Sequence, residues 1–161
     1  MPTSILKLNK ARELTIFAGT ALLTMLASQA SSYLVDAHLE VNETYTLNTF
    51  IYFTHTRNFG TSFGLLHGMG WLISISSAII LCGIIVYLMR KKDAKLYEHV
   101  CFGFIVGAGF SNILDRIIYG SVVDFIDIQH IPYWHYIFNT ADVMIHVGIW
   151  PIIIFALLRK S

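Results

Sequence analysis

The sequence predicts a mainly α membrane protein with four transmembrane helices and a small β-sheet, or cradle, on its outer face. The 161-residue chain is 55% hydrophobic and only 13% charged, whereas soluble domains usually contain about 25% charged residues. Four uncharged stretches can each account for one span, alone or with flanking residues. The length leaves no room for a second large domain, so we expect a single integral membrane domain over residues 1–161.

The first helix is expected over residues 13–35, after a basic segment at residues 1–12. The uncharged stretch 14–35 is long enough to cross a bilayer without flanking residues, since a span needs about 20 residues. A cleaved signal peptide is the alternative for this segment, with a weak cleavage site at residues 28–30. Cleavage would leave three spans and would break the agreement between charge and topology.

The segment at residues 36–66 is expected to form β-structure on the outer face. Residues 44–54 are rich in Thr and aromatic side chains with partial alternation, which is typical of a strand. Tyr and Phe there also suit the aromatic belt of a membrane interface. Asn58-Phe59-Gly60 is a turn signal.

The other three helices are expected at residues 68–89, 97–118 and 139–158. The uncharged stretches 99–114 and 143–158 hold 16 residues each, so each must recruit flanking residues to span the bilayer. Those flanks contain Asp115 and Asp142. We therefore expect both aspartates at the ends of spanning helices rather than in distant loops.

The start and the middle of the fourth helix contain three informative residues, Asn139, Asp142 and Pro151. Asn139 and Asp142 have the spacing of a capping box, so capping alone is one interpretation of Asp142. Pro151 is expected to kink this helix unless neighbouring groups compensate.

The segment before the fourth helix, residues 119–137, is expected to be an outer loop. In the third helix, small residues such as Gly107 predict close helix packing.

The basic residues indicate the orientation of the chain in the membrane. Of the eleven Lys and Arg residues, only Arg57 and Arg116 fall on the side opposite the termini if there are four spans. The positive-inside rule then places both termini in the cytoplasm. The acidic residues expected on or near the outer side are Asp36, Glu40, Glu43, Asp115, Asp124, Asp127 and Asp142.

Asp124 and Asp142 are the candidate pair for acid–base chemistry. A carboxylate in or near lipid is costly and usually functional. Asp124 stands among Val, Phe and Ile residues, a setting that raises the pKa of a carboxyl group. Two carboxyls that share one proton can deprotonate water and protonate a leaving amine. The spacing leaves open whether these two side chains meet.

The remaining polar candidates have structural alternatives. Asn112 and Asp115 are one helical turn apart and share a face that we expect to point inward. Asp115 precedes Arg116, so an ion pair at the helix end is the alternative to a functional role. Asp127 is expected to be solvated or part of a turn.

Several other function classes find little support in the sequence. The seven histidines include no HExxH motif and no compact cluster with Cys, so no metal site is expected. A phosphate-binding Gly-rich loop and a Ser nucleophile elbow are also absent. A transporter or proton relay would place its charges deeper in the helices. Cys82 and Cys101 fit small core residues.

At four places the chain resembles the lipoprotein signal peptidases, also called type II signal peptidases. Residues 58–64 resemble the family's Asn-x-Gly-x-(Ala/Ser)-Phe element, and residues 107–116 resemble its Gly-rich Asn-x-x-Asp-Arg helix. Residues 122–125 and 138–142 resemble its two catalytic aspartate motifs. The resemblance covers nearly the whole chain, in motif order and in the four-span plan.

This resemblance implies an intramembrane aspartic endopeptidase. Such an enzyme removes the signal peptide from diacylglyceryl-modified prolipoproteins by cutting before the lipidated cysteine. Asp124 and Asp142 would be the catalytic dyad, and Asp115 would support Arg116 or the loop. The residues that would position the substrate backbone or orient the dyad are Asn58, Asn112, Arg116 and Asn139.

The resemblance also implies where the protein acts and with what. It implies a bacterial inner membrane, an active site near the outer face, and a cradle formed by residues 36–66 over that site. The lipid chains of the substrate would lie in the bilayer between the helices. No metal, organic cofactor or nucleic acid is expected, and a monomer is favoured.

The chain departs from the family pattern in the first helix. The family usually has Asp-Gln-x-x-Lys near the outer end of this helix, whereas here Ser28 and Ser32 replace both charges. Ser111 also stands where the family usually has Gly. Losing both members of an ion pair together can cost little. The change keeps open a second function, that of a non-catalytic lipoprotein-binding paralogue on the same scaffold.

Overall fold

The computed structural model describes residues 3–60, 68–91 and 93–158, and it contains four long helices and a four-stranded sheet. The helices are α1 (Thr3–His38), α2 (Gly70–Arg90), α3 (Leu96–Tyr119) and α4 (Thr140–Leu158), and the strands are β1 (Thr44–Thr46), β2 (Ile51–Asn58), β3 (Val122–Ile128) and β4 (Ile137–Phe138). All four helices are long and apolar enough to cross a membrane. The predicted fold class, four spanning helices with a small sheet, is confirmed.

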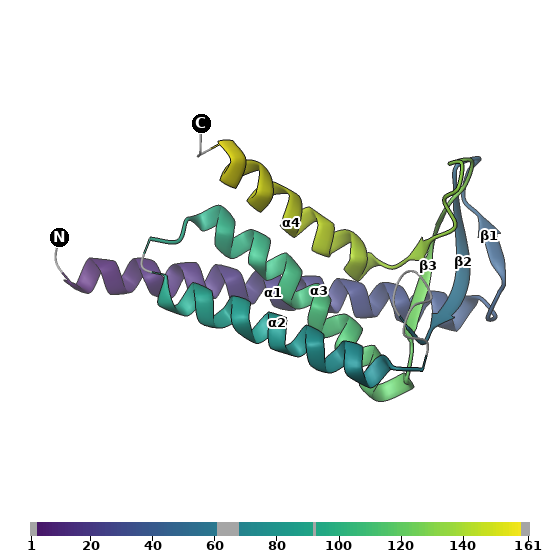
Figure 1. Cartoon of the computed structure of the whole chain (residues 1–161), viewed down its shortest axis with the longest axis horizontal. Coiled ribbons are helices and arrows are strands. Elements are labelled where there is room, and N and C mark those ends of the chain that lie inside the picture. The colour runs from purple at the N-terminus through teal and green to yellow at the C-terminus, as the bar shows by residue number, and fades with distance from the viewer. Residues whose placement is uncertain (1–2, 61–67, 92, 159–161) are drawn as a thin grey trace.

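The sheet lies at one end of the helical bundle. Figure 1 shows β1, β2 and β3 at the end of the molecule where α1 ends and α4 begins, while the start of α1 and the end of α4 lie toward the opposite end. Arg90 ends α2, and Lys91 and Lys95 lie in the α2–α3 connection, all at that opposite end. The charge asymmetry seen in the sequence therefore corresponds to the two ends of the molecule.

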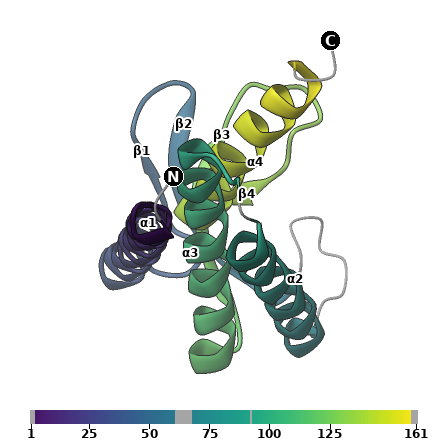
Figure 2. The same cartoon turned by 90° about the vertical axis from the view of Figure 1, so that its left-hand side faces the viewer.

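Helix α3 is the central element of the bundle. It packs against α1, α2 and α4, and Figure 2 shows it between α1 on one side and α2 on the other. Gly107 lets α3 approach α1 closely, because a Cβ atom there would lie 2.1 Å from the Ala21 carbonyl oxygen. Gly148 lets α4 approach α3 in the same way, because a Cβ atom there would lie 2.5 Å from the Cys101 carbonyl oxygen. The expected close packing of small residues in the third helix is confirmed.

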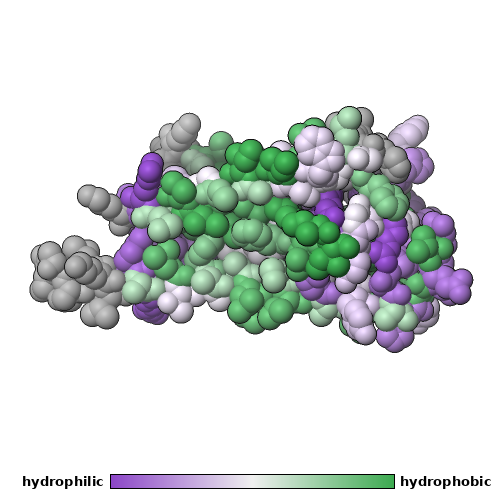
Figure 3. Space-filling model, turned by 90° about the horizontal axis from the view of Figure 1, so that it is seen from below, coloured by the Kyte–Doolittle hydropathy of each residue, from purple (hydrophilic) through white to green (hydrophobic). Residues whose placement is uncertain are grey.

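The outer faces of the bundle are apolar. Large side chains such as Leu23 on α1, Ile79 on α2 and Leu157 on α4 are each more than half exposed. Figure 3 shows a hydrophobic band over the middle of the molecule, with hydrophilic residues toward both ends. This distribution suits helices whose outer faces contact lipid chains.

The predicted ends of the helices hold to within two residues for α2, α3 and α4, but not for α1. The first helix was expected over residues 13–35, and it extends from Thr3 to His38. The basic segment is helical because Lys, Leu, Arg and Glu are good helix formers and no Gly or Pro interrupts it after residue 2. Helix α4 runs through Pro151 without interruption.

The outer loop predicted at residues 119–137 is wrong, because it contains strand β3 and the start of β4. Strand β3 is the third strand of an antiparallel sheet with the order β1-β2-β3-β4. Its β-branched residues favour a strand, but two Asp residues interrupt the apolar pattern. Of the β-rich segment predicted at residues 36–66, β1 and β2 are confirmed, residues 36–38 instead end α1, and residues 61–66 lie outside the described residues.

Candidate active site

Asp124 and Asp142 come from different elements and line the same polar cavity of about 170 Å³. Asp124 lies on β3, and Asp142 lies in the first turn of α4. The other polar side chains at this cavity include Asn58 of β2, Asn112 and Arg116 of α3, and Asn139. The structure thus brings together six of the seven residues that the sequence singled out, and Asp115 alone does not line the cavity.

Asp124 is 4% exposed and both of its carboxylate oxygens accept hydrogen bonds. Asn58 Nδ2 donates to one oxygen at 2.7 Å, and Asn139 Nδ2 donates to the other at 2.7 Å. Burial raises the pKa of Asp124 to about 7, and the neighbouring charge of Asp142 adds to this effect. The two amide bonds and the charge of Arg116 act in the opposite direction. Asp124 therefore holds a proton more tightly than an ordinary aspartate.

Asp142 and Asn139 form the capping box that the sequence predicted. The main-chain N–H of Asp142 donates to Asn139 Oδ1 at 2.9 Å, and the main-chain N–H of Asn139 donates to Asp142 Oδ2 at 3.3 Å. Asn112 Nδ2 donates to the other carboxylate oxygen of Asp142 at 3.1 Å. Asn139 therefore contacts both aspartates, and capping and a place at the cavity are compatible for Asp142.

Arg116 brings a positive charge to the polar cavity. Its Nη1 donates to the Asn112 carbonyl oxygen at 3.1 Å, and its Nη2 donates to the Gly60 carbonyl oxygen at 3.0 Å. In the part of the chain that the structure describes, Arg116 forms no direct ion pair with Asp115, so the alternative of an ion pair at the helix end is wrong. The guanidinium group instead ties α3 to the turn after β2.

Asp115 is 3% exposed and faces α1. Gln29 Nε2 donates to Asp115 Oδ1 at 2.7 Å and to Ser111 Oγ at 3.0 Å. The inward orientation predicted for Asp115 is confirmed. Gln29 and Ser111 were missed as partners, although both stand in motifs where the chain departs from the family pattern.

The two serines that replace the family's charged residues in the first helix are buried. Ser28 is 1% exposed and Ser32 is 8% exposed. The neighbouring Ser31 donates its hydroxyl to Thr140 Oγ1 of α4 at 2.7 Å. Small neutral residues therefore fill the space between α1 and its neighbours. The four-residue spacing of Thr24, Ser28 and Ser32, all buried, is a helical stripe that sequence inspection could have found.

The other candidates lie apart from the polar cavity. Asp127 is on β3 rather than in a turn, and it accepts a hydrogen bond from Thr54 Oγ1 at 3.0 Å. Residues 61–64 of the Asn58 motif lie outside the described residues. Across the described ranges, His, Cys, Asp and Glu side chains form no group of three that could hold a metal ion.

A second, apolar cavity of about 760 Å³ is also lined by Asp142. Its walls include Trp134 and Tyr136 before β4, and Val147 and Trp150 on α4. Asp142 lines both this cavity and the polar one. One carboxylate therefore stands between a polar space and an apolar space.

Comparison with known proteins agrees with these features. The family model described as signal peptidase (SPase) II matches residues 20–158. A protein named lipoprotein signal peptidase from Halalkalibacterium halodurans is 34% identical over 135 residues, which cover 83% of this chain and 86% of that protein. One of the same name from Bacillus subtilis is 31% identical over 142 residues, covering 88% and 92%.

Solved structures show the same similarity in three dimensions. A structure described as a bacterial membrane enzyme superposes with a TM-score of 0.82 and 27% sequence identity, and the match covers 88% of this chain and 87% of that chain. A second structure with a similar description gives a TM-score of 0.78 at 27% identity and covers 88% and 92%.

Proposed function

This chain belongs to the signal peptidase II family, and we propose that it cleaves signal peptides from diacylglyceryl-modified prolipoproteins as an aspartic endopeptidase. It is a multi-pass bacterial membrane protein and a peptidase of lipoprotein processing. The observation that best supports the aspartic mechanism is the pair of Asp124 and Asp142 on one polar cavity, both bonded to Asn139. The intact pair argues against a non-catalytic binding protein.

The two aspartates have separate roles in the proposed reaction. Asp124 carries the shared proton near neutral pH, because burial raises its pKa to about 7. Asp142 then acts as the base that takes a proton from water, while Asp124 gives its proton to the carbonyl oxygen of the scissile peptide bond. The resulting gem-diol collapses when Asp142 gives its proton to the leaving nitrogen and Asp124 takes a proton back from one hydroxyl group. The carbonyl then re-forms, the C–N bond breaks, and Asp124 again carries the shared proton.

The neutral and cationic neighbours hold the dyad and the substrate. Asn58 and Asn139 fix the two oxygens of Asp124, and Asn112 fixes one oxygen of Asp142. The charge of Arg116 at the same cavity stabilises negative charge that develops on the substrate carbonyl oxygen.

The two cavities fit the two parts of the proposed substrate. The peptide bond to be cut lies directly before a cysteine that bears two acyl chains, so polar and apolar groups must bind side by side. The polar cavity suits the peptide bond, and the apolar cavity suits an acyl chain. Asp142, which lines both, lies where these two parts of the substrate meet.

We further propose that the sheet end of the molecule lies on the outer face of the inner membrane, with both termini in the cytoplasm. The support is the position of Arg90, Lys91 and Lys95 at the end opposite the sheet. The positive-inside rule places such an end in the cytoplasm. The site then acts on lipoproteins after their export.

The proposed function is tested by cleavage of a diacylglyceryl-modified prolipoprotein by the purified protein in detergent. We expect a product whose first residue is the lipidated cysteine, identified by mass spectrometry. The same precursor without its lipid is the matched control and should be cleaved poorly. Binding of the lipidated precursor without any product would instead support the non-catalytic paralogue.

The pH dependence of cleavage should follow the proton on Asp124. Since the pKa of Asp124 is raised to about 7, kcat/KM should be high below that pH and fall as the pH rises through it. This apparent value belongs to the pair of carboxyls, since the two interact. A profile between pH 5 and pH 9 measures the decline, and a constant kcat/KM across this range would contradict the assigned proton.

Filling the apolar cavity should weaken binding of the lipidated substrate. Val147 lies on its wall and is 44% exposed, so Val147→Trp places an indole where an acyl chain is proposed to lie. We expect KM to rise about tenfold with little change in kcat. Ile154→Trp is the control, because Ile154 is an exposed residue of α4 outside this cavity. Equal kinetics for the two variants would contradict the assignment of this cavity.

A further inference from the structure

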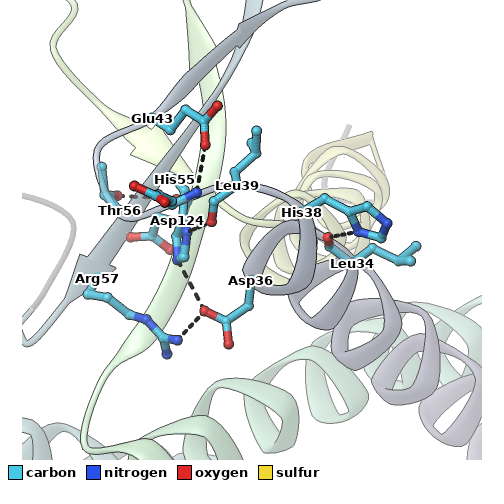
Figure 4. A network of polar contacts seen from close by, with 10 residues as sticks. Leu34, Asp36, His38, Leu39, Glu43, His55, Thr56, Arg57 and Asp124 are labelled. Atoms are coloured by element: carbon cyan, nitrogen blue, oxygen red, sulfur yellow. Dashed lines mark hydrogen bonds and ion pairs between the residues drawn. The ribbon is translucent and has the colours of Figure 1, made fainter.

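Three charged or titratable residues join the end of α1 to strand β2. Asp36 belongs to the last turn of α1, and His55 and Arg57 lie on β2. We refer to Asp36, His55 and Arg57 as the clasp. Figure 4 shows the carboxylate of Asp36 facing both the His55 ring and the Arg57 guanidinium. None of these three residues belongs to the motifs that the family resemblance identified as functional.

His55 is the buried member of the clasp, at 1% exposure. Its Nδ1 donates to the Leu39 carbonyl oxygen at 2.8 Å, directly after α1. Its Nε2 lies 3.4 Å from Asp36 Oδ1. The ring therefore forms a hydrogen bond to Leu39 and approaches the Asp36 carboxylate without a hydrogen bond, although His55 itself is part of the sheet.

The backbone around His55 is also tied to the segment after α1. The main-chain N–H of His55 donates to the Glu43 carbonyl oxygen at 3.0 Å, and the His55 carbonyl oxygen accepts from the Asn42 N–H at 2.7 Å. The pairing of β2 with β3 shifts register between Phe53 and Thr56. Such a bulge turns side chains away from the regular alternation and is frequent beside active sites.

Arg57 extends the clasp to a third element. Its guanidinium pairs with Asp36 and lies over the ring of Tyr119, 5.9 Å from the ring centroid. Tyr119 is the last residue of α3. The end of β2 is therefore attached to the sheet-proximal ends of both α1 and α3.

Side chains on the other face of β2 contact Asp124. Asn58 follows Arg57 and donates to Asp124 Oδ2 at 2.7 Å. Thr56 precedes Arg57 and donates its hydroxyl to the Asp124 main-chain carbonyl at 3.2 Å. Successive side chains of a strand point to opposite faces, so the residues that bind the helix ends alternate with residues that bind Asp124.

We propose that Asp36, His55 and Arg57 are positioning residues that hold the end of β2 against the helix ends and so keep Asn58 bonded to Asp124. The clasp acts through Asn58 and touches neither the proposed substrate nor the dyad. Its effect on catalysis rests on the proposed function, whereas its effect on the position of Asn58 does not.

Weakening the clasp should change the pH dependence of kcat/KM in a specific direction. The bond from Asn58 lowers the pKa of Asp124, against the upward effect of burial and of Asp142. The other groups that face Asp124 are Asn139 and, from α3, Arg116. Neither of them is part of the clasp. Loosening Asn58 therefore moves the alkaline decline of kcat/KM to higher pH.

The test compares Asp36→Asn, His55→Gln and the double variant with the parent protein. We expect kcat to fall about tenfold in each single variant with little change in KM, and the alkaline decline to move up in pH as in Asn58→Ala. The double variant should be no slower than the slower single variant, because both residues act through one contact.

His38→Gln is the matched control. His38 lies at the same end of α1, but its ring bonds the Leu34 carbonyl oxygen at 2.8 Å and points away from the clasp, as Figure 4 shows. This variant should retain the kinetics of the parent. Clasp variants with parental kcat would overturn the proposal, and so would a loss of kcat with an unmoved alkaline decline, which indicates a merely structural role.

A second measurement separates the clasp from the proposed function. In protein labelled with ¹⁵N-asparagine, the side-chain amide of Asn58 reports its hydrogen bond to Asp124 whether or not the protein cleaves substrate. We expect this resonance to shift in Asp36→Asn and His55→Gln and to stay unchanged in His38→Gln. An unmoved Asn58 resonance in both clasp variants would overturn the clasp, whether or not the parent protein cleaves the lipidated precursor.

Discussion

Asp124→Asn and Asp142→Asn should each lower kcat for cleavage by about 10³-fold or more, since neither an acid nor a base remains in place of the lost carboxyl group. Both variants should still insert and fold. Asparagine has the shape of aspartate, and only one hydrogen bond at each site meets a mismatched NH₂ group. Such a mismatch costs about 1–3 kcal/mol.

The mismatch at Asp124 is predictable because its partners are fixed. Asn58 and Asn139 both donate to Asp124, and their own amide oxygens already accept from the main-chain N–H groups of Gly60 and Asp142. Neither side-chain amide can rotate by half a turn without losing the hydrogen bond that its oxygen accepts from the main chain. Asp124→Asn should therefore be less stable than the parent but remain folded.

Asp127→Asn is the matched control for Asp124→Asn. Asp127 lies three residues later on the same strand and is bonded to the hydroxyl of Thr54 rather than to the polar cavity. This variant should cleave the lipidated precursor at the parental rate. Single-turnover assays at equal amounts of folded protein provide the comparison, and circular dichroism confirms the fold. Substantial cleavage by Asp124→Asn and Asp142→Asn would refute the aspartic mechanism.

Gly107→Ala should have the largest effect on stability, because it forces α1 and α3 apart. A Cβ atom at this position would lie 2.1 Å from the Ala21 carbonyl oxygen and less than 3 Å from two further backbone atoms. Backbone cannot rotate away as a flexible side chain can. We expect a loss of about 3 kcal/mol or more, and with it the displacement of Gln29, which bonds Asp115 across the same helix pair.

Gly83→Ala is the control for this substitution. Gly83 lies in the spanning helix α2, and a Cβ atom there would have no neighbour within 4 Å. This variant should be as stable as the parent or slightly more stable, since alanine favours helix more than glycine does. Thermal unfolding in detergent measures both variants. Equal unfolding temperatures for Gly107→Ala and the parent would show that the two helices are not so closely packed.

The sequence predicted the helices well because their signal is local. Each uncharged stretch had to form hydrogen bonds within itself to cross a bilayer, which determined four helices and, for α2, α3 and α4, both ends to within two residues. Strand β3 was missed because its strand pairing depends on β2, far away in the chain. Val122 and Val123 favour a strand by residue type. Nothing local, however, predicts the pairing with β2 that brings Asn58 to the Asp124 carboxylate.

The candidate site shows the same division between local and non-local signals. The capping box of Asn139 and Asp142 was predictable, because both residues lie within one helical turn. The bond from Gln29 to Asp115 joins residues 86 positions apart. The pairing of Asp36 with Arg57 likewise depends on how β2 docks on the end of α1. No spacing rule within one element predicts either contact.

The split origin of the polar cavity has a consequence for the newly made chain. Asp124 belongs to the sheet and Asp142 to the last helix, and Asn139 reaches both only when β3 and α4 are docked. A partly synthesised or partly inserted chain thus cannot bring together the two carboxyl groups of the proposed dyad. Under the proposed aspartic mechanism, cleavage by this protein therefore begins only after β3 and α4 have docked.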